Sequence, residues 1–251
     1  MSLAEEKAWR ALAAIPGLGS KALWRIADLL LSRGRTASWL LENPQPAREI
    51  LAGLKAGTVP ADLSLAESAG QVPALPEGVT LLHPLQPAFP RRLLERRTRL
   101  PLPALLYASG DPALLGLPAV AVVGRRDADE EARAIAAALA ARLAEGGAAV
   151  VSGHAAGIDA AAHAGALRAG GATLAVLPEG LGGFRARPEL RSLLGAGQAL
   201  FLSQFHPTAG WAPFQAMARN KLVAALADAM VVVRCGLERD HRGRRSGTFD
   251  A

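Results

Sequence analysis

Residues 119–180 read AVAVVGRRDADEEARAIAAALAARLAEGGAAVVSGHAAGIDAAAHAGALRAGGATLAVLPEG. Three apolar runs alternate here with two glycine-containing turns and two Ala-rich segments. Apolar runs without polar alternation are typical of strands that are covered on both faces. Strand and helix alternation with short loops predicts an α/β fold with a doubly wound, mostly parallel sheet.

The alternation of expected strands and helices continues after residue 180, whereas the N-terminal residues have a helical pattern. Strands are expected at 119–123, 148–152, 172–177, 199–203 and 229–234, and helices near 128–145, 158–169, 187–195 and 215–226. A further short strand is expected near Leu105–Asp111, and residues 3–42 have the apolar spacing of helices. A stretch rich in Pro, Gly and Ala near 60–75 indicates a boundary. We therefore expect a small helical domain over 1–65 and an α/β domain over 75–251.

The composition indicates a globular protein with an anionic partner. The chain has 251 residues, 51% of them hydrophobic, and a formal net charge of +6. Five arginines against one glutamate give +4 over residues 91–99, and seven basic against four acidic residues give +3 over residues 219–251. Such clustering favours a binding face for anions, although an Arg-rich proteome without any basic site also fits the net charge.

Several other classes are disfavoured. One cysteine, Cys235, cannot form an intrachain disulfide, and the five histidines lack cysteine partners at metal-ligand spacing. The acidic, polar N-terminus is unlike a signal peptide, and no apolar run is long enough for a membrane span. We expect a cytoplasmic protein with no metal and no cofactor.

The first glycine turn, Gly124-Arg125-Arg126, follows a strand and precedes a helix. Glycine lets the backbone approach a ligand closely, and arginine pairs two phosphate oxygens at once. The G-x-G-x-x-G pattern and the P-loop are both absent, which argues against a free nucleotide cofactor. The alternative is a tight turn with two surface arginines.

The second turn contains Ser152, Gly153 and Gly157, and Asp159 opens the helix that follows. Exposed N–H groups at such a helix start favour anions. Asp159 and His163 lie four residues apart on one helix face, where a mutually satisfied structural pair is a better interpretation than acid–base catalysis.

Two later polar clusters are further candidates. Arg219, Asn220 and Lys221 precede the apolar run Leu222–Leu226, and a basic cluster at a helix start suits a phosphate. Ser246, Gly247 and Thr248 add hydroxyl and backbone donors near the end of the chain. The segment Ile15–Gly19 has the look of a helix-hairpin-helix turn, although an ordinary turn explains it as well.

Taken in order, these segments resemble the DprA/Smf DNA-processing family over residues 80–251. The resemblance rests on LHP and FPRRLL in 82–94, LLYASGD at 105–111, VVGRR at 122–126, VSGHAAGID at 151–159, RNK at 219–221 and SGT at 246–248. It implies an extended Rossmann-like fold preceded by a small SAM or helix-hairpin-helix domain. It also implies single-stranded DNA binding, a homodimer, delivery of DNA to the RecA recombinase in natural transformation, and no catalysis.

The family motifs place the DNA-binding residues at Gly124, Arg125, Arg126, Ser152, Gly153, Gly157, Arg219, Asn220, Lys221, Ser246, Gly247 and Thr248. Arg125 stands where the family usually has Ser, and Met217-Ala218 replaces its Phe-Pro. The chain ends at Ala251, within the last family motif. It is therefore identified as a diverged or C-terminally short member.

Two other functions stay open at this point. The stretch Leu177–Gly183 faintly resembles the loop of lysine-decarboxylase-like nucleotide N-glycosidases, which share a similar fold. A scaffold that binds partners without DNA affinity is the second alternative. Trp211 and Phe214 are the aromatic residues nearest to the basic clusters, so stacking on bases is expected to contribute less than charge.

Overall fold

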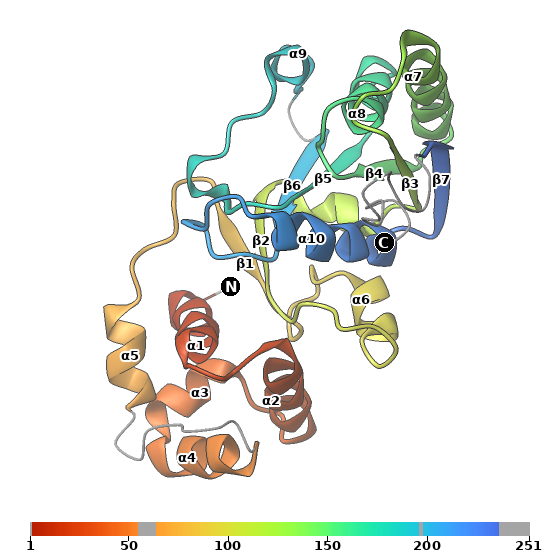
Figure 1. Cartoon of the computed structure of the whole chain (residues 1–251). Helices are drawn as coiled ribbons and strands as arrows, with labels where there is room; N and C mark the ends of the chain where they lie inside the picture. The colour runs from red at the N-terminus through yellow and green to blue at the C-terminus, as the bar shows by residue number, and fades with distance from the viewer. Residues whose placement is uncertain (1, 55–63, 196–197, 236–251) are drawn as a thin grey trace. The chain divides into compact units, whose positions relative to one another are not determined.

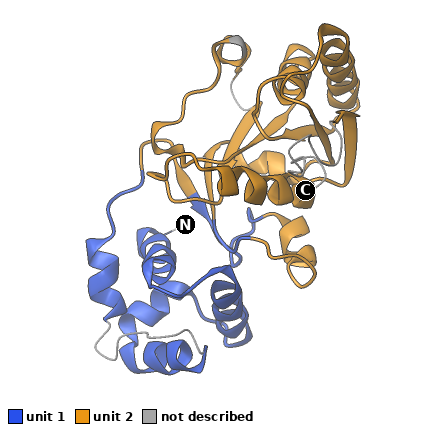
Figure 2. Cartoon of the chain, viewed as in Figure 1, with its two compact units in different colours: residues 1–75, 81–89, 103–105 blue, residues 76–80, 90–102, 106–251 orange. Residues whose placement is uncertain are grey.

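The computed structural model describes residues 2–54, 64–195 and 198–235 of the chain. The chain forms two compact units, coloured separately in Figure 2. The first unit comprises residues 1–75, 81–89 and 103–105, and the second comprises residues 76–80, 90–102 and 106–251.

The N-terminal part of the first unit is helical, as the apolar spacing predicts. It contains α1 (Leu3–Ala14), α2 (Ser20–Ser32), α3 (Ala37–Glu42), α4 (Pro44–Gly53) and α5 (Leu65–Gln71). The Ser2 hydroxyl accepts from the Glu5 N–H and caps α1. Gly17, with φ of 85°, supplies the left-handed residue between α1 and α2. Fully buried side chains such as Trp9, Leu12, Ile26 and Leu30 form the core of this unit.

A buried carboxylate, that of Glu5, joins α1 to the start of α3. The two Glu5 oxygens accept from Trp9 Nε1 at 2.9 Å and from the N–H groups of Ala37 and Ser38 at 3.0 and 2.8 Å. Glu5 therefore caps α3, whose first N–H groups lack helical partners. The buried His83 ring stacks on Trp9 with centroids 5.2 Å apart, and burial lowers the pKa of His83 to about 4.

Seven strands form one sheet in the order β1-β2-β6-β5-β4-β3-β7. They are β1 (Thr80–Leu82), β2 (Leu106–Gly110), β3 (Ala119–Gly124), β4 (Ala149–Ser152), β5 (Thr173–Leu177), β6 (Ala199–Ser203) and β7 (Ala229–Arg234). β3 pairs in parallel with β4 and β7, and β5 with β4 and β6, whereas β2 pairs antiparallel with β6. The predicted doubly wound, mostly parallel sheet is thus confirmed (Figure 1).

The helices α7 (Glu130–Glu145) and α8 (Ile158–Arg168) pack against each other and against β3 and β4 (Figure 1). Their contact is lined by alanines, including Ala136 and Ala140 of α7 and Ala162 of α8. A Cβ on Gly165 would lie 2.2 Å from the Ala137 carbonyl oxygen, so the two helices approach too closely for any side chain there. The Ala richness of the sequence therefore reflects close helix packing.

The helix α10 (Pro213–Leu226) packs against β3, β4, β5 and the short helix α6 (Arg91–Arg96). α6 carries part of the predicted basic face, and the structure corrects that prediction for two of its arginines. Arg96 donates to the carbonyls of Ala224, Ala225 and Ala227 at the end of α10, where helical carbonyls lack partners. Arg92 binds both carboxylate oxygens of Asp228. These two arginines therefore connect α6 to the end of α10 and to Asp228, and their charges serve the fold.

The predicted strands agree with the observed ones to within one residue at each end. The helix expected over 187–195 is shorter, because α9 spans only Pro188–Arg191. No helix in the described ranges is both long enough and apolar enough to cross a membrane. Nor do the described residues place three His, Cys, Asp or Glu side chains together as a metal site.

Candidate nucleic-acid interface

The order of the strands indicates where a ligand would bind at this sheet. The chain proceeds outward from β3 through β4, β5 and β6, and then returns to place β7 on the other side of β3. In doubly wound sheets ligands bind at such a reversal, beyond the carboxyl ends of the strands. The loop Gly124–Arg126 leaves β3 at this point.

The first loop is held against β7 and α8. The Arg125 N–H donates to the Arg234 carbonyl at 2.8 Å. A Cβ on Gly124 would lie 2.6 Å from that same oxygen and 2.7 Å from Ile158 Cγ1, so only glycine fits. The position of this loop is therefore set by backbone contacts, which leaves its two arginine side chains outside the packing.

The two arginines of this loop differ in their partners. Arg125 donates twice to Asp127, at 2.9 and 2.6 Å, and this hydrogen-bonded carboxylate raises the pKa of the Arg125 guanidinium. Arg126 is exposed and makes no hydrogen bond or ion pair with any described residue. Arg126 is accordingly the arginine of this loop that is available to an anion, while the charge of Arg125 is already paired.

The second loop, between β4 and α8, is joined to the first. The Ile158 N–H donates to the Arg125 carbonyl at 3.2 Å. Gly157 has φ of 77°, and a Cβ there would lie 2.3 Å from the Arg125 oxygen and 2.5 Å from the Arg126 oxygen. The two glycine turns thus form one interlocked unit at the edge of the sheet, as their positions after neighbouring strands predict.

Ser152 faces inward rather than toward a ligand. It is fully buried, and its hydroxyl donates to the Val122 carbonyl at 2.7 Å. In this structure the hydroxyl links β4 to β3 and does not reach the surface.

Gly153 makes room for a buried ion pair behind the loops. Arg219 Nη1 lies 3.6 Å from Asp159 Oδ2, and both residues are buried. A Cβ on Gly153 would fall 1.0 Å from Arg219 Nη1. Burial raises the pKa of the Asp159 carboxyl, opposed by the Arg219 charge and by the N–H of Ala155. Burial also lowers the pKa of Arg219, an effect that Asp159 opposes and that the charge of Arg126 reinforces.

The pairing of Asp159 with Arg219 corrects the expected partnership of Asp159 with His163. His163 is buried, and its Nδ1 lies 2.6 Å from Thr173 Oγ1 on β5. Burial lowers the pKa of His163 to about 3, so the ring is neutral near pH 7. Asp159 and His163 are four residues apart on α8, but Asp159 pairs with Arg219 of α10 and His163 pairs with Thr173 of β5.

The structure separates the members of the RNK cluster. Arg219, Asn220 and Lys221 lie in the middle of α10 and not at its start, since the helix begins at Pro213. Arg219 and Lys221 are two residues apart, about 200° around the helix, so they cannot face the same phosphate. Lys221 is exposed and, within the described ranges, has no ion-pair partner, whereas Asn220 is half-buried. The candidate residues Ser246, Gly247 and Thr248 lie outside the described residues.

A groove of about 760 Å³, which the sequence patterns did not predict, adjoins the second loop. His154, Glu179, Arg185, Arg187 and Trp211 are among the residues that line it. The loops after β5 and β6 meet here, because the N–H of Gly180 donates to Ala209 and that of Gly182 donates to Pro207. Gly180 and Gly182 are the sequence signal that could have indicated a close backbone approach, because a Cβ on them would lie 2.1 Å from the His206 oxygen and 2.8 Å from the Pro207 oxygen, respectively.

Comparison with known proteins decides the family. The sequence profile of the family described as DNA recombination-mediator protein A matches residues 80–246, which include both glycine turns and α10. The chain belongs to this DprA/Smf DNA-processing family. The matched residues that the structure describes include the interlocked loops, the Asp159–Arg219 pair and most of the groove.

Named relatives agree with this assignment. The chain is 43% identical over 141 residues to a putative DNA processing protein DprA of Mycobacterium tuberculosis, covering 54% of this chain and 36% of that protein. It is 37% identical over 132 residues to the DNA processing protein DprA of Streptococcus pneumoniae, covering 52% and 46%. The chain therefore matches less than half the length of these two relatives.

Solved structures show the same fold. The crystal structure of S. pneumoniae DprA has a TM-score of 0.70 and 26% identity, covering 92% of this chain and 77% of that one. The DNA processing protein A of Helicobacter pylori has a TM-score of 0.52 and 28% identity, covering 64% and 71%. The H. pylori protein has a unique single-stranded DNA binding mode.

Proposed function

We propose that this protein binds single-stranded DNA at the edge of the sheet formed by the two interlocked loops and the exposed side of α10. The observation that supports this proposal most strongly concerns Arg126. Its guanidinium is exposed and has no partner among the described residues, and its loop is fixed by contacts at Gly124 and Gly157. Arginine on a fixed backbone suits a phosphate diester, because the guanidinium presents paired donors to phosphate oxygens.

The candidate DNA-binding residues then have different roles. Arg126 and Lys221 contact phosphates directly. Gly124 and Gly157 allow close backbone contacts that a larger residue would prevent, and Gly153 leaves room for the Arg219 guanidinium. Arg219 is a positioning residue, because its buried ion pair with Asp159 lies behind the loops. Ser152, Arg125 and Asn220 support the same surface, and Ser246–Thr248 are kept as further contacts.

The wider role follows from the family. We propose that the protein acts as a homodimeric recombination mediator that delivers single-stranded DNA to RecA during DNA uptake, without catalysis and without a cofactor. The support is the family assignment together with the single-stranded DNA binding of the H. pylori relative. The chain's partial coverage of its relatives makes RecA binding and dimerisation separate questions from DNA binding.

A direct test compares single-stranded and duplex oligonucleotides in equilibrium titrations by fluorescence anisotropy. The proposal predicts tighter binding of the single strand, and a severalfold weaker binding for Arg126→Ala. Arg168→Ala is a matched control for loss of one exposed arginine, because Arg168 lies at the C-terminal end of α8 and the second loop lies at its N-terminal end. Equal titration curves for wild type and Arg126→Ala would remove Arg126 from the site, and preference for the duplex would contradict the proposal.

The enzyme alternative has its own decisive assay. Glu179 lines the groove, but the proposed function gives this carboxylate no catalytic role. Incubation with AMP should therefore release no adenine, as measured by chromatography. Release of adenine at a rate proportional to the protein concentration would favour the N-glycosidase.

A further inference from the structure

Two aromatic side chains are unusually exposed beside the proposed DNA-binding surface. Trp211 is 57% exposed and Phe214 is 69% exposed, at the start of α10. Among the described residues, the other large apolar side chains that are exposed are aliphatic or Met. By contrast, Trp9, Trp24, Phe89 and Tyr107 are buried. In a chain with only 4% aromatic residues, two exposed rings three residues apart are candidates for a binding role, because aromatic rings supply large contact areas at interfaces.

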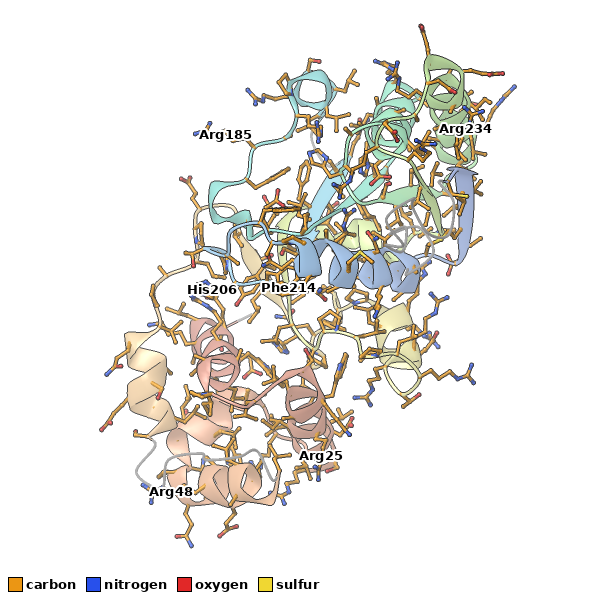
Figure 3. The ribbon with its side chains drawn as sticks, in the orientation of Figure 1. Arg25, Arg48, Arg185, His206, Phe214 and Arg234 are labelled. Carbon is orange, nitrogen blue, oxygen red and sulfur yellow. The ribbon has the colours of Figure 1, made fainter. Side chains whose placement is uncertain are left out.

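Contacts place the two side chains along one surface of the second unit. Trp211 lines the groove together with Arg185 and Arg187. Phe214 meets Phe205 edge-on, with centroids 6.5 Å apart at 90°. Figure 3 shows Phe214 at the N-terminal end of α10 and His206 on the loop that precedes the helix. Phe214 therefore has one aromatic neighbour, while most of its surface stays in solvent.

The exposed side of α10 continues this surface toward a positive charge. Phe214 and Lys221 are seven residues apart, two helical turns, and thus project on the same side of the helix about 10.5 Å apart along its axis. Both are exposed. Along α10 an aromatic ring is thus followed by an ammonium group, and Trp211, which precedes the helix, lines the groove with Arg185 and Arg187.

This alternation matches one kind of occupant. A single-stranded nucleic acid presents unpaired bases and phosphates in turn, and proteins hold it with aromatic faces and a basic track. A lipid surface or a hydrophobic protein helix would need a continuous apolar patch, whereas here Arg185 and Arg187 line the groove with Trp211, and Lys221 lies two turns along α10 from Phe214. Charge complementarity therefore favours the nucleic acid.

We propose that Trp211 and Phe214 are a base-stacking subsite, which extends the path of single-stranded DNA from the interlocked loops across the start of α10. This inference rests on the proposed function. It identifies nucleobases, and not only phosphates, as groups that the surface recognises. It also assigns a function to two residues that lie outside the family motifs.

The experiment uses two oligonucleotides of equal length, oligothymidylate and its abasic counterpart, which keeps the phosphates but has no bases. Trp211→Ala and Phe214→Ala should each weaken binding of oligothymidylate by about 5- to 140-fold, the range for loss of one stacked base. They should leave binding of the abasic strand unchanged. Trp211→Phe should retain most of the affinity, and Ile135→Ala, which removes a 53% exposed side chain from α7, should change neither.

The outcomes separate the two proposals. Arg126→Ala should weaken both oligonucleotides, because it removes a phosphate contact. If Arg126→Ala acts and the aromatic variants bind oligothymidylate like the wild type, the stacking subsite is overturned while DNA binding stands. If the wild type binds neither oligonucleotide, both proposals fail. If the aromatic variants keep both affinities but lose binding to purified RecA, the surface docks a protein and the stacking proposal is overturned.

Discussion

The buried pair of Arg219 and Asp159 allows a quantitative prediction. Replacing Arg219 by Met keeps an unbranched apolar stem but removes the guanidinium, and so leaves the Asp159 carboxylate without its charged partner 3.6 Å away. Removing one member of a buried ion pair costs about 3–5 kcal/mol, because the remaining charge is uncompensated. For a domain of this size each kcal/mol shifts the melting temperature by about 2–4 °C. The expected loss in thermal stability is therefore about 6–20 °C.

The cost should depend on pH in a defined direction. Burial already raises the pKa of Asp159 in the folded protein, so the folded state holds this proton at pH values where the unfolded state has released it. Stability from this group is accordingly present at low pH and falls as the pH rises. Loss of Arg219 removes an interaction that favours the charged carboxylate. The deficit of Arg219→Met relative to wild type should therefore be smaller at about pH 5 than at about pH 8.

A double variant controls for loss of packing. Asp159→Asn removes the charge but keeps an oxygen that can accept from the Ala155 N–H. Combined with Arg219→Met, it should recover more than half of the lost stability, because neither charge is then buried alone. Circular dichroism melts of the wild type, both single variants and the double variant measure this coupling. A single-variant loss below about 1 kcal/mol, or losses that simply add, would refute an energetically important pair.

Three further predictions use other contacts. Lys221→Ala should weaken single-stranded DNA binding without changing the melting temperature, since Lys221 is exposed, and an unaltered dissociation constant would exclude it from the site. Gly157→Ala should destabilise the protein by at least about 1–3 kcal/mol, because the position has φ of 77° and faces the Arg125 carbonyl, and a wild-type melt would contradict this. His83 is buried and has a pKa of about 4, so stability should be complete above pH 6.5 and fall as the pH drops from 6.5 toward 4. His83→Phe should flatten that profile, and Trp9 fluorescence can report it.

The fold was predictable because the central strands β4 and β5 are buried along their whole length and β3 is buried or half-buried throughout, whereas β7 is also an apolar run but is largely exposed. Buried strands appear as continuous apolar runs, as at Ala119–Val123, and the glycine turns mark where each strand ends. The position of β7 beside β3 could not be predicted from these local patterns, because strand order depends on helix packing. The length of α9 was also missed, since the apolar residues after Arg191 extend the pattern but not the helix.

The candidate site was predictable in its loops but not in its side-chain pairs. The turns at Gly124 and Gly157 follow neighbouring strands, which the sequence order alone indicates. The partners of Arg96 and Arg219 are carbonyl and carboxylate groups far away in the chain. An arginine that stabilises a helix end and an arginine that binds DNA have the same local sequence signal, so only the tertiary structure distinguishes them.

The salt dependence of single-stranded DNA binding tests the central claim most directly. Neutralising three to five phosphates predicts a slope of about −2 to −4 for log affinity against log salt concentration, at about −0.7 per phosphate. Arg126→Ala should make that slope less steep by about 0.7. A wild-type slope near zero, or a slope that Arg126→Ala does not change, would contradict a phosphate-binding edge at the interlocked loops.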